Sequence, residues 1–268
     1  MRRVCIAPVF AAWRVAARGL LAAGVEPRGV VWEEADGEQP VLGGLLEEAP
    51  APRAGAAGRV PRAFMHLADA AACHSDPERW ALLYRVLWRL AHGEPRLMEV
   101  AMDPDVHRML AMEKAVRRDM HKTKAFVRFR AVDLGVGTHY VAWFEPDHRT
   151  LERTAPFFAE RFASMSWSIL TPRRCAHWDG ADLWYSAGAA RSSAPSPDAL
   201  EELWRTYYAS VFNPARMKPK AMRAEMPLKY WRNLPEAELI QPLMRDAPRR
   251  VREMIEKQHQ EKHGRRER

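Results

Sequence analysis

A dense cluster of basic side chains lies between residues 105 and 130. It comprises Lys114, Arg117, Arg118, His121, Lys122, Lys124, Arg128 and Arg130. The first four recur at spacings of three, four and seven residues, which places them beside one another if this segment is an α-helix. Like charges held this close repel each other by about 0.2–0.5 kcal/mol per pair. Such crowding favours a repeating anion as the partner, and the phosphates of a nucleic acid fit that description.

A second basic group follows residue 213 and is interleaved with aromatic residues. Its candidate phosphate contacts are Arg216, Lys218, Lys229 and Arg232. Cationic and aromatic side chains together suit a groove that follows a nucleic-acid backbone while bases stack on its rings. The aromatic candidates to support an unstacked base are Trp143, Tyr230 and Trp231.

Glu145, Asp147 and His148 share one expected turn directly after a strand. From such a position a carboxylate and an imidazole can act as acid and base, provided that a pocket shifts their pKa values. The same residue types also favour turns for local hydrogen bonding alone. Glu145 and His148 are therefore candidate catalytic residues, with a purely structural turn as the alternative.

Sequence motifs for metals and cofactors are missing. The three cysteines are far apart, and no pair has the two-residue spacing of metal or redox sites. His139, His148 and His177 have no recognised ligand spacing either, and no glycine-rich phosphate loop precedes a helix. We therefore expect no metal, no cofactor and no iron–sulfur centre, in a reduced cytoplasmic protein.

The charge of the chain is unevenly distributed. The 268 residues carry a formal net charge of +8, yet residues 33–48 contain six carboxylates and no Lys or Arg. The basic surplus therefore lies downstream, which favours nucleic acid or another anionic surface as partner. No apolar stretch is long enough to span a bilayer, so we expect no membrane partner.

The first 58 residues predict a small α/β segment followed by a flexible acidic loop. Residues 4–7 and 29–32 have the pattern of short strands, and residues 10–23 that of a helix closed by Gly24. Residues 33–58 are rich in Gly, Pro, Ala and Glu without a period, which is typical of an exposed linker. We place a boundary near residues 51–59.

Residues 59–244 predict a larger α+β domain. Apolar spacing predicts amphipathic helices over 61–73, 76–92, 105–121 and 197–212. Alternation predicts strands over 125–131, 139–144, 166–170 and 183–187, with a helix around 155–165. This order predicts an antiparallel sheet with a strand-strand-helix-strand-strand core, surrounded by several amphipathic helices. Residues 245–268 read as a charged helical tail.

Residues 80–231 carry motifs that resemble a bacterial protein family. The motifs are ALLYRVLWRL (81–90), MEKAVRRDMHKTKAFVRFR (112–130), YVAWFEPDH (140–148), WSILTP (167–172), WDG (178–180), LWRTYYASVFNPAR (203–216) and MPLKYWRNLPEA (226–237). A looser match, AAWRVAARGLLAAGVEPRGVVW (11–32), extends the resemblance to nearly the whole chain. The family that it resembles is a domain of unknown function described as a DNA metabolism or DNA repair protein.

The resemblance implies partners rather than a reaction. The similar proteins are encoded beside a radical SAM protein of the spore photoproduct lyase type, and a related form is fused to a uracil-DNA glycosylase-like domain. We therefore expect a DNA-binding component of a repair or DNA metabolism system that works with such partners. Two alternatives stay open: an enzyme that acts directly on DNA as a lyase, glycosylase or nuclease, and a protein-only adaptor for the radical SAM partner. Whether the chain is itself an enzyme is left open.

Overall fold

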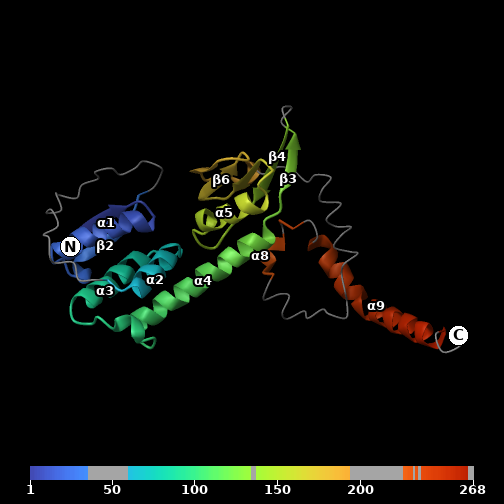
Figure 1. The fold of residues 1–268 in the computed structure, drawn as a ribbon, viewed down its shortest axis with the longest axis horizontal. Helices are drawn as coiled ribbons and strands as arrows, with labels where there is room; N and C mark the ends of the chain where they lie inside the picture. The colour runs from blue at the N-terminus through green and yellow to red at the C-terminus, as the bar shows by residue number, and fades with distance from the viewer. Residues whose placement is uncertain (36–59, 134–136, 194–225, 232, 235–236, 265–268) are drawn as a thin grey trace.

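Two hydrophobic cores lie at the two ends of one long helix, α4 (Pro104–Phe126), in the computed structural model (Figure 1). The structure describes residues 1–35, 60–133, 137–193, 226–231, 233–234 and 237–264. At 23 residues, α4 is about 35 Å long. It is the element that joins the N-terminal lobe to the sheet that follows it.

The N-terminal lobe packs a small parallel sheet against helices. Its elements are β1 (Arg2–Ile6), α1 (Phe10–Ala22), η1 (Pro27–Gly29), β2 (Val30–Glu34), α2 (Arg62–Ala72), α3 (Arg79–Ala91) and η2 (Leu97–Glu99). Trp13, Phe64 and Trp80 are buried together, and the Trp13 indole donates to the Trp80 carbonyl at 3.3 Å. The predicted N-terminal α/β segment is therefore present, and it shares one core with the helices beyond the boundary expected near residue 58.

The second core is built around a five-stranded sheet. Its elements are β3 (Arg130–Asp133), β4 (Thr138–Trp143), α5 (Leu151–Arg161), β5 (Trp167–Leu170), β6 (Arg174–Trp178), β7 (Leu183–Ala187), η3 (Arg191–Ser193) and α8 (Leu228–Trp231). The strand order is β3-β4-β5-β6-β7. The helix α9 (Ala237–Gly264) follows and runs without a break through residue 245, where the sequence predicted the start of a tail.

The predicted α+β class is confirmed, but the sheet is mixed rather than antiparallel. β4 and β5 pair in parallel, whereas the other neighbouring strands of this sheet pair antiparallel. The reason is the helix between them, because a chain that returns through a helix crossover enters the sheet in the same direction. The strand β6 was not predicted. The sequence indicated the end of a strand at Thr171 and Pro172 and a turn at residues 178–180, and β6 lies between them and includes the first residue of that turn.

The helix α4 is longer than its basic segment indicated. The sequence predicted a strand from residue 125, yet α4 continues to Phe126 and β3 begins at Arg130. Phe126 extends the buried stripe that contains Met112 and Val116, so its burial favours another helical turn. The alternation of apolar and basic residues in 125–131 therefore spans a helix end, a connection and the first residues of a strand.

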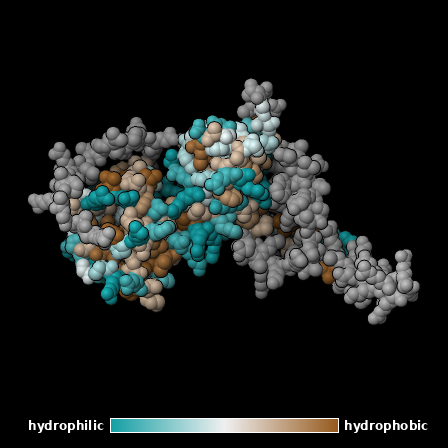
Figure 2. Space-filling view, in the orientation of Figure 1, coloured by the Kyte–Doolittle hydropathy of each residue, from teal (hydrophilic) through white to brown (hydrophobic). Residues whose placement is uncertain are grey.

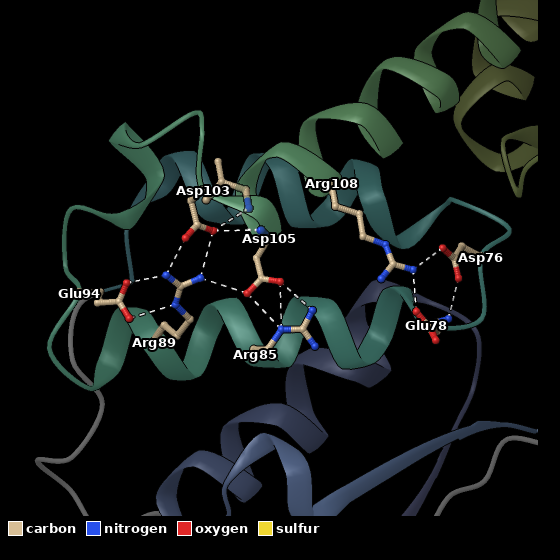
Figure 3. Close-up of polar contacts among 9 residues, drawn as sticks. Asp76, Glu78, Arg85, Arg89, Glu94, Asp103, Asp105 and Arg108 are labelled. Carbon is tan, nitrogen blue, oxygen red and sulfur yellow. Dashed lines mark hydrogen bonds and ion pairs between the residues drawn. The ribbon is translucent and has the colours of Figure 1, made fainter.

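An ion network fixes the start of α4 against α3 (Figure 3). Arg89 donates to Glu94, Asp103 and Asp105, and Arg85 forms a fork with Asp105. Asp103 is also the N-cap of α4, because its carboxylate accepts the backbone N–H groups of Asp105 and Val106. The network therefore ties the C-terminal part of α3 to the first turn of α4.

Replacing Asp103 with asparagine tests this network. The hydrogen bond from Arg89 holds the pKa of Asp103 below its ordinary value. The contribution of the ionised Asp103 to the free energy of unfolding is therefore present above about pH 4, the ordinary pKa of an aspartate. It is lost as the pH falls through the lowered pKa of the folded state. Asparagine keeps the cap but not the charge, so Asp103→Asn is expected to cost about 1 kcal/mol at pH 7. Urea unfolding at several pH values checks this; a gap between the two proteins that persists unchanged at pH 2 would contradict it.

Candidate functional site

The basic residues predicted on the helix lie on the exposed face of α4. The exposed ones are Lys114, Arg117, Arg118, His121 and Lys124, and Lys122 is half-buried. Among the described residues, this face has one ion pair, from Arg117 Nε to Glu113 Oε1 at 3.9 Å, and such exposed pairs contribute little. Lys124 Nζ lies 4.7 Å from the ring centre of Phe157. Figure 2 shows hydrophilic side chains gathered over this part of the molecule.

The inward face of α4 carries a buried carboxylate that sequence reasoning missed. Asp119 is 3% exposed and accepts hydrogen bonds from the N–H groups of Asp147 (3.0 Å) and His148 (3.2 Å). It also accepts the Thr150 hydroxyl at 2.8 Å. The signal was an aspartate inside an otherwise apolar helical stripe, which needs a partner when it is buried.

The position of Asp119 shows on which side of α4 the basic residues lie. Arg117 and His121 are each two residues away from it, which on an α-helix is roughly 200° around the axis. Arg117 and His121 therefore lie on the side of the helix opposite the loop bound by Asp119, whereas Lys122, three residues from Asp119, lies nearer to that loop. We name this loop, residues 145–150, the β4–α5 loop.

The β4–α5 loop connects the two lobes. The Arg149 N–H donates to the Cys73 carbonyl at 2.8 Å, and the Arg149 guanidinium contacts Glu34 of β2 at 2.5 Å. From α5, Arg153 contacts Asp69 of α2 at 2.5 Å. These contacts hold the sheet against the N-terminal lobe.

A cleft of about 1070 Å³ lies between the lobes at these contacts. Four segments from distant parts of the chain form its walls: residues 7–10, 69–73, 145–153 and 171–174. Further lining comes from the end of β2, the end of β7 and α8. The cleft brings together Glu145, Asp147 and His148, as their shared turn predicted.

His148 lines this cleft, and its hydrogen bonding fixes which ring nitrogen carries the proton. Its Nδ1 accepts the Ser75 backbone N–H at 3.2 Å, so a neutral ring carries its proton on Nε2. Burial lowers the pKa of His148, while Asp119 and Asp147 oppose the shift and Arg173 and Lys229 reinforce it. At neutral pH the ring is therefore uncharged, and it can donate through Nε2 but is poorly placed to act as a base there.

The two carboxylates of the β4–α5 loop already have partners. Glu145 accepts the Trp143 indole N–H at 2.9 Å and lies 3.5 Å from the Arg191 guanidinium. Asp147 forms an ion pair with Lys229. Lys229, predicted as a phosphate contact, therefore lies at the cleft rather than beside the basic face of α4.

Tyr230 is a core residue and not a base-stacking residue. Its ring is 1% exposed and is stacked between Phe126 and Phe144, at centroid distances of 5.4 and 5.1 Å. Both ring faces are covered, so no base can stack there. Trp143 is 8% exposed, and Trp231 is half-buried with its indole bonded to the Met226 carbonyl. Tyr230 thus anchors α8 in the second core.

Two substitutions at Tyr230 test this assignment. Tyr230→Phe keeps both ring stacks and is expected to change the free energy of unfolding by no more than about 1 kcal/mol. Tyr230→Ala removes a buried ring, with an expected loss of about 3–5 kcal/mol. Chemical denaturation measures both. A Tyr230→Ala protein as stable as the wild type would place this ring outside the core.

The remaining cations predicted to bind phosphate are only partly described by the structure. Arg128 and Arg130 are half-buried beyond the end of α4, and Arg128 Nη1 donates to the Ala125 carbonyl at 2.7 Å. Arg216, Lys218 and Arg232 lie outside the described residues. The described cations thus divide between the outer face of α4, the end of this helix and the cleft.

His139 and His177 belong to a hydrogen-bonded chain on the sheet rather than to the cleft. His139 contacts Ser166 through Nδ1 and Ser168 through Nε2, and Ser168 contacts His177 Nδ1, all at 2.8 Å. His177 Nε2 continues to Ser186 at 2.8 Å. Burial lowers the pKa of both imidazoles. Within the described part of the chain, no group of three or more His, Cys, Asp or Glu residues could hold a metal ion.

No helix that the structure describes combines the length and the apolar character needed to cross a bilayer.

The chain is thus an α+β protein with two notable surfaces: a basic face on α4, and a cleft lined by residues from both lobes. The chain belongs to the DUF4130 family, a domain of unknown function, whose model matches residues 77–236. That region contains α4, the β4–α5 loop and the 171–174 wall of the cleft. No curated protein and no solved structure matches the chain significantly. The match confirms the resemblance to a domain of unknown function, whereas the repair and radical SAM associations stay predictions.

Proposed function

We propose that this chain is a DNA-binding component of a bacterial DNA repair or DNA metabolism system and that the outer face of α4 contacts the phosphates. The observation that carries the proposal is the set of exposed cations in residues 114–124, with one weak ion pair among the described residues. These residues span about 15 Å of helix. Over that length a DNA duplex presents about nine phosphates, which is an ample counter-charge.

The proposed contacts are to phosphates rather than to base edges. Lysine and arginine side chains on one helix face, without accompanying Asn or Gln at matching spacing, position a protein on the backbone but carry little sequence information. Binding is therefore expected to depend strongly on salt and weakly on sequence. A protein of this kind can hold DNA for a partner, and by resemblance the partner is a radical SAM protein of the spore photoproduct lyase type or a uracil-DNA glycosylase-like protein.

A pair of matched charge reversals tests the proposal. Fluorescence anisotropy with a labelled duplex is measured for Arg117→Glu/Arg118→Glu and for Arg14→Glu/Arg18→Glu. The second pair removes two exposed cations from α1 and changes the net charge equally. The α4 variant is expected to lose most of its affinity, while the α1 variant stays near the wild type. Equal losses would show general charge attraction and would overturn the assignment to α4.

An enzyme acting directly on DNA is the second candidate, because the cleft brings Glu145, Asp147 and His148 into one wall. In this case Glu145 is the stronger base candidate, since the His148 ring presents a proton and not a lone pair. Incubation of the purified chain with lesion-bearing duplex, with and without divalent metal, separates the two functions. Product formed without any partner, and lost in Glu145→Gln, would establish the enzyme.

A protein-only adaptor for the radical SAM partner predicts a third combination of results. In that case Arg117→Glu/Arg118→Glu leaves the affinity for DNA unchanged but abolishes co-purification with the radical SAM partner.

A further inference from the structure

The cleft has an uncompensated cation on one wall. Each lining carboxylate already has a basic partner: Glu34 has Arg79 and Arg149, Asp69 has Arg153, Glu145 has Arg191, Asp147 has Lys229, and Glu152 has Arg174. Arg173 also lines the cleft, is exposed, and has no carboxylate partner among the described residues. The lining residues alone balance in charge, but Arg79 and Arg191, which neutralise Glu34 and Glu145 from outside the lining, leave a positive surplus around the cleft.

Two further groups with N–H donors, His148 and Lys229, line the same cleft as Arg173. His148 offers Nε2–H, because its other ring nitrogen accepts the Ser75 N–H. Lys229 and Arg173 both lie close enough to reinforce the lowered pKa of His148. The Lys229 ammonium forms an ion pair with Asp147, and its three N–H donors allow it to contact a further acceptor as well. A cleft that offers a guanidinium, an ammonium and an imidazole N–H suits the several oxygens of a phosphate group.

The opposite wall of the cleft has a different character. Residues 7–10, which connect β1 to α1, contribute Ala7, Pro8, Val9 and Phe10. Val9 is 37% exposed, and Phe10 is stacked on Trp13 at 5.6 Å. The cleft thus has a cationic side and an apolar side. Its volume of about 1070 Å³ is at the upper end of small-molecule sites, so a ligand of nucleotide size fits.

We propose that this cleft binds a nucleotide-sized ligand through its phosphate, with Arg173 as the principal cation, His148 Nε2–H and Lys229 as further donors, and residues 7–10 against the apolar part of the ligand. This site goes beyond the DNA contact on α4 and does not depend on it, because Arg117 and His121 lie on the side of that helix opposite the β4–α5 loop, which lines the cleft. The phosphate belongs either to a free nucleotide or to the end of a DNA strand.

Calorimetric titration of the full chain tests the phosphate requirement. Deoxynucleoside 5′-monophosphates, the corresponding nucleosides and inorganic phosphate are the probes. Monophosphates are expected to bind at least about tenfold more tightly than nucleosides, and Arg173→Ala is expected to remove that difference. Arg161→Ala, an exposed position on α5 outside the cleft, is the matched control and should bind as the wild type. Arg173→Lys should restore part of the affinity, since a cation remains.

A second arm separates the two sources of phosphate. Single-stranded oligonucleotides with a 5′-phosphate and with a 5′-hydroxyl are compared in the wild type and in Arg173→Ala. An advantage for the phosphorylated strand that disappears in Arg173→Ala assigns a strand end, and Arg173-dependent binding of mononucleotides alone assigns a free nucleotide. Both support the site. Binding that is independent of the phosphate, or equal in wild type and Arg173→Ala, overturns it.

The α4 variant keeps this test independent of the proposed function. Arg117→Glu/Arg118→Glu should leave mononucleotide binding unchanged, and Arg173→Ala should leave the affinity for an internal duplex segment unchanged. Failure of one proposal is therefore distinguishable from failure of the other.

Discussion

Replacing Asp119 with alanine is expected to lower the free energy of unfolding by about 3–5 kcal/mol, as much as the removal of the buried Tyr230 ring. The carboxylate is buried and accepts two backbone N–H groups and the Thr150 hydroxyl. Hydrogen bonds to charged groups contribute about 1.5–3 kcal/mol each, and the orphaned donors would stay inside the protein. The β4–α5 loop would lose its attachment to α4, so the interlobe cleft should be disturbed as well.

Urea denaturation of three variants checks this expectation. Asp119→Asn keeps one carbonyl acceptor and should fall between the wild type and Asp119→Ala. Glu113→Ala changes a less buried carboxylate on the same helix and controls for the change in charge and helix propensity. If Asp119→Ala unfolds at the same urea concentration as Glu113→Ala, the loop does not depend on Asp119.

Removal of three cations from the outer face of α4 is expected to weaken duplex binding by about 100-fold near 0.15 M salt. The variant is Lys114→Ala/Arg117→Ala/Arg118→Ala, at three positions that are exposed. Each phosphate that is no longer neutralised keeps about 0.9 counterions that the wild type would release, and at this salt concentration three such phosphates give roughly that factor. Alanine is a strong helix former, so α4 itself should remain intact.

The control for this variant removes three exposed cations from the N-terminal lobe. Arg14→Ala/Arg18→Ala/Arg62→Ala has the same net charge as the α4 variant. It should retain duplex affinity within a few fold of the wild type, because long-range attraction between exposed charges is screened at this salt concentration. Anisotropy titrations of both variants measure the difference. A reduction in the α4 variant that is no larger than in this control would count against the phosphate surface.

Local sequence patterns predicted the elements whose neighbours lie close in the chain. The helix around Met109, Met112 and Val116 follows from apolar spacing, and the basic side chains fall on its other face because the same period applies to both. The short N-terminal strands and the helix between them were likewise predicted. The turn that places Glu145 and His148 together after β4 was also evident from the sequence.

Features that depend on distant segments could not be predicted in this way. The cleft needs residues 7–10, 69–73, 145–153 and 171–174 to meet, and no local pattern encodes that meeting. Tyr230 looked like a stacking residue because basic residues surround it, whereas its burial depends on Phe126 and Phe144, which are far away in the chain. Asp119 is the instructive case, since a carboxylate in an apolar stripe predicts a buried partner without identifying it.

The slope of log affinity against log salt tests the central claim most directly. It is measured on a DNA duplex for the wild type and for Lys114→Ala/Arg117→Ala/Arg118→Ala. If these side chains neutralise phosphates, the slope of the variant should be shallower by about 2.7, that is, about 0.9 for each phosphate that the variant no longer neutralises. Parallel lines for the two proteins would mean that the outer face of α4 takes no part in binding DNA.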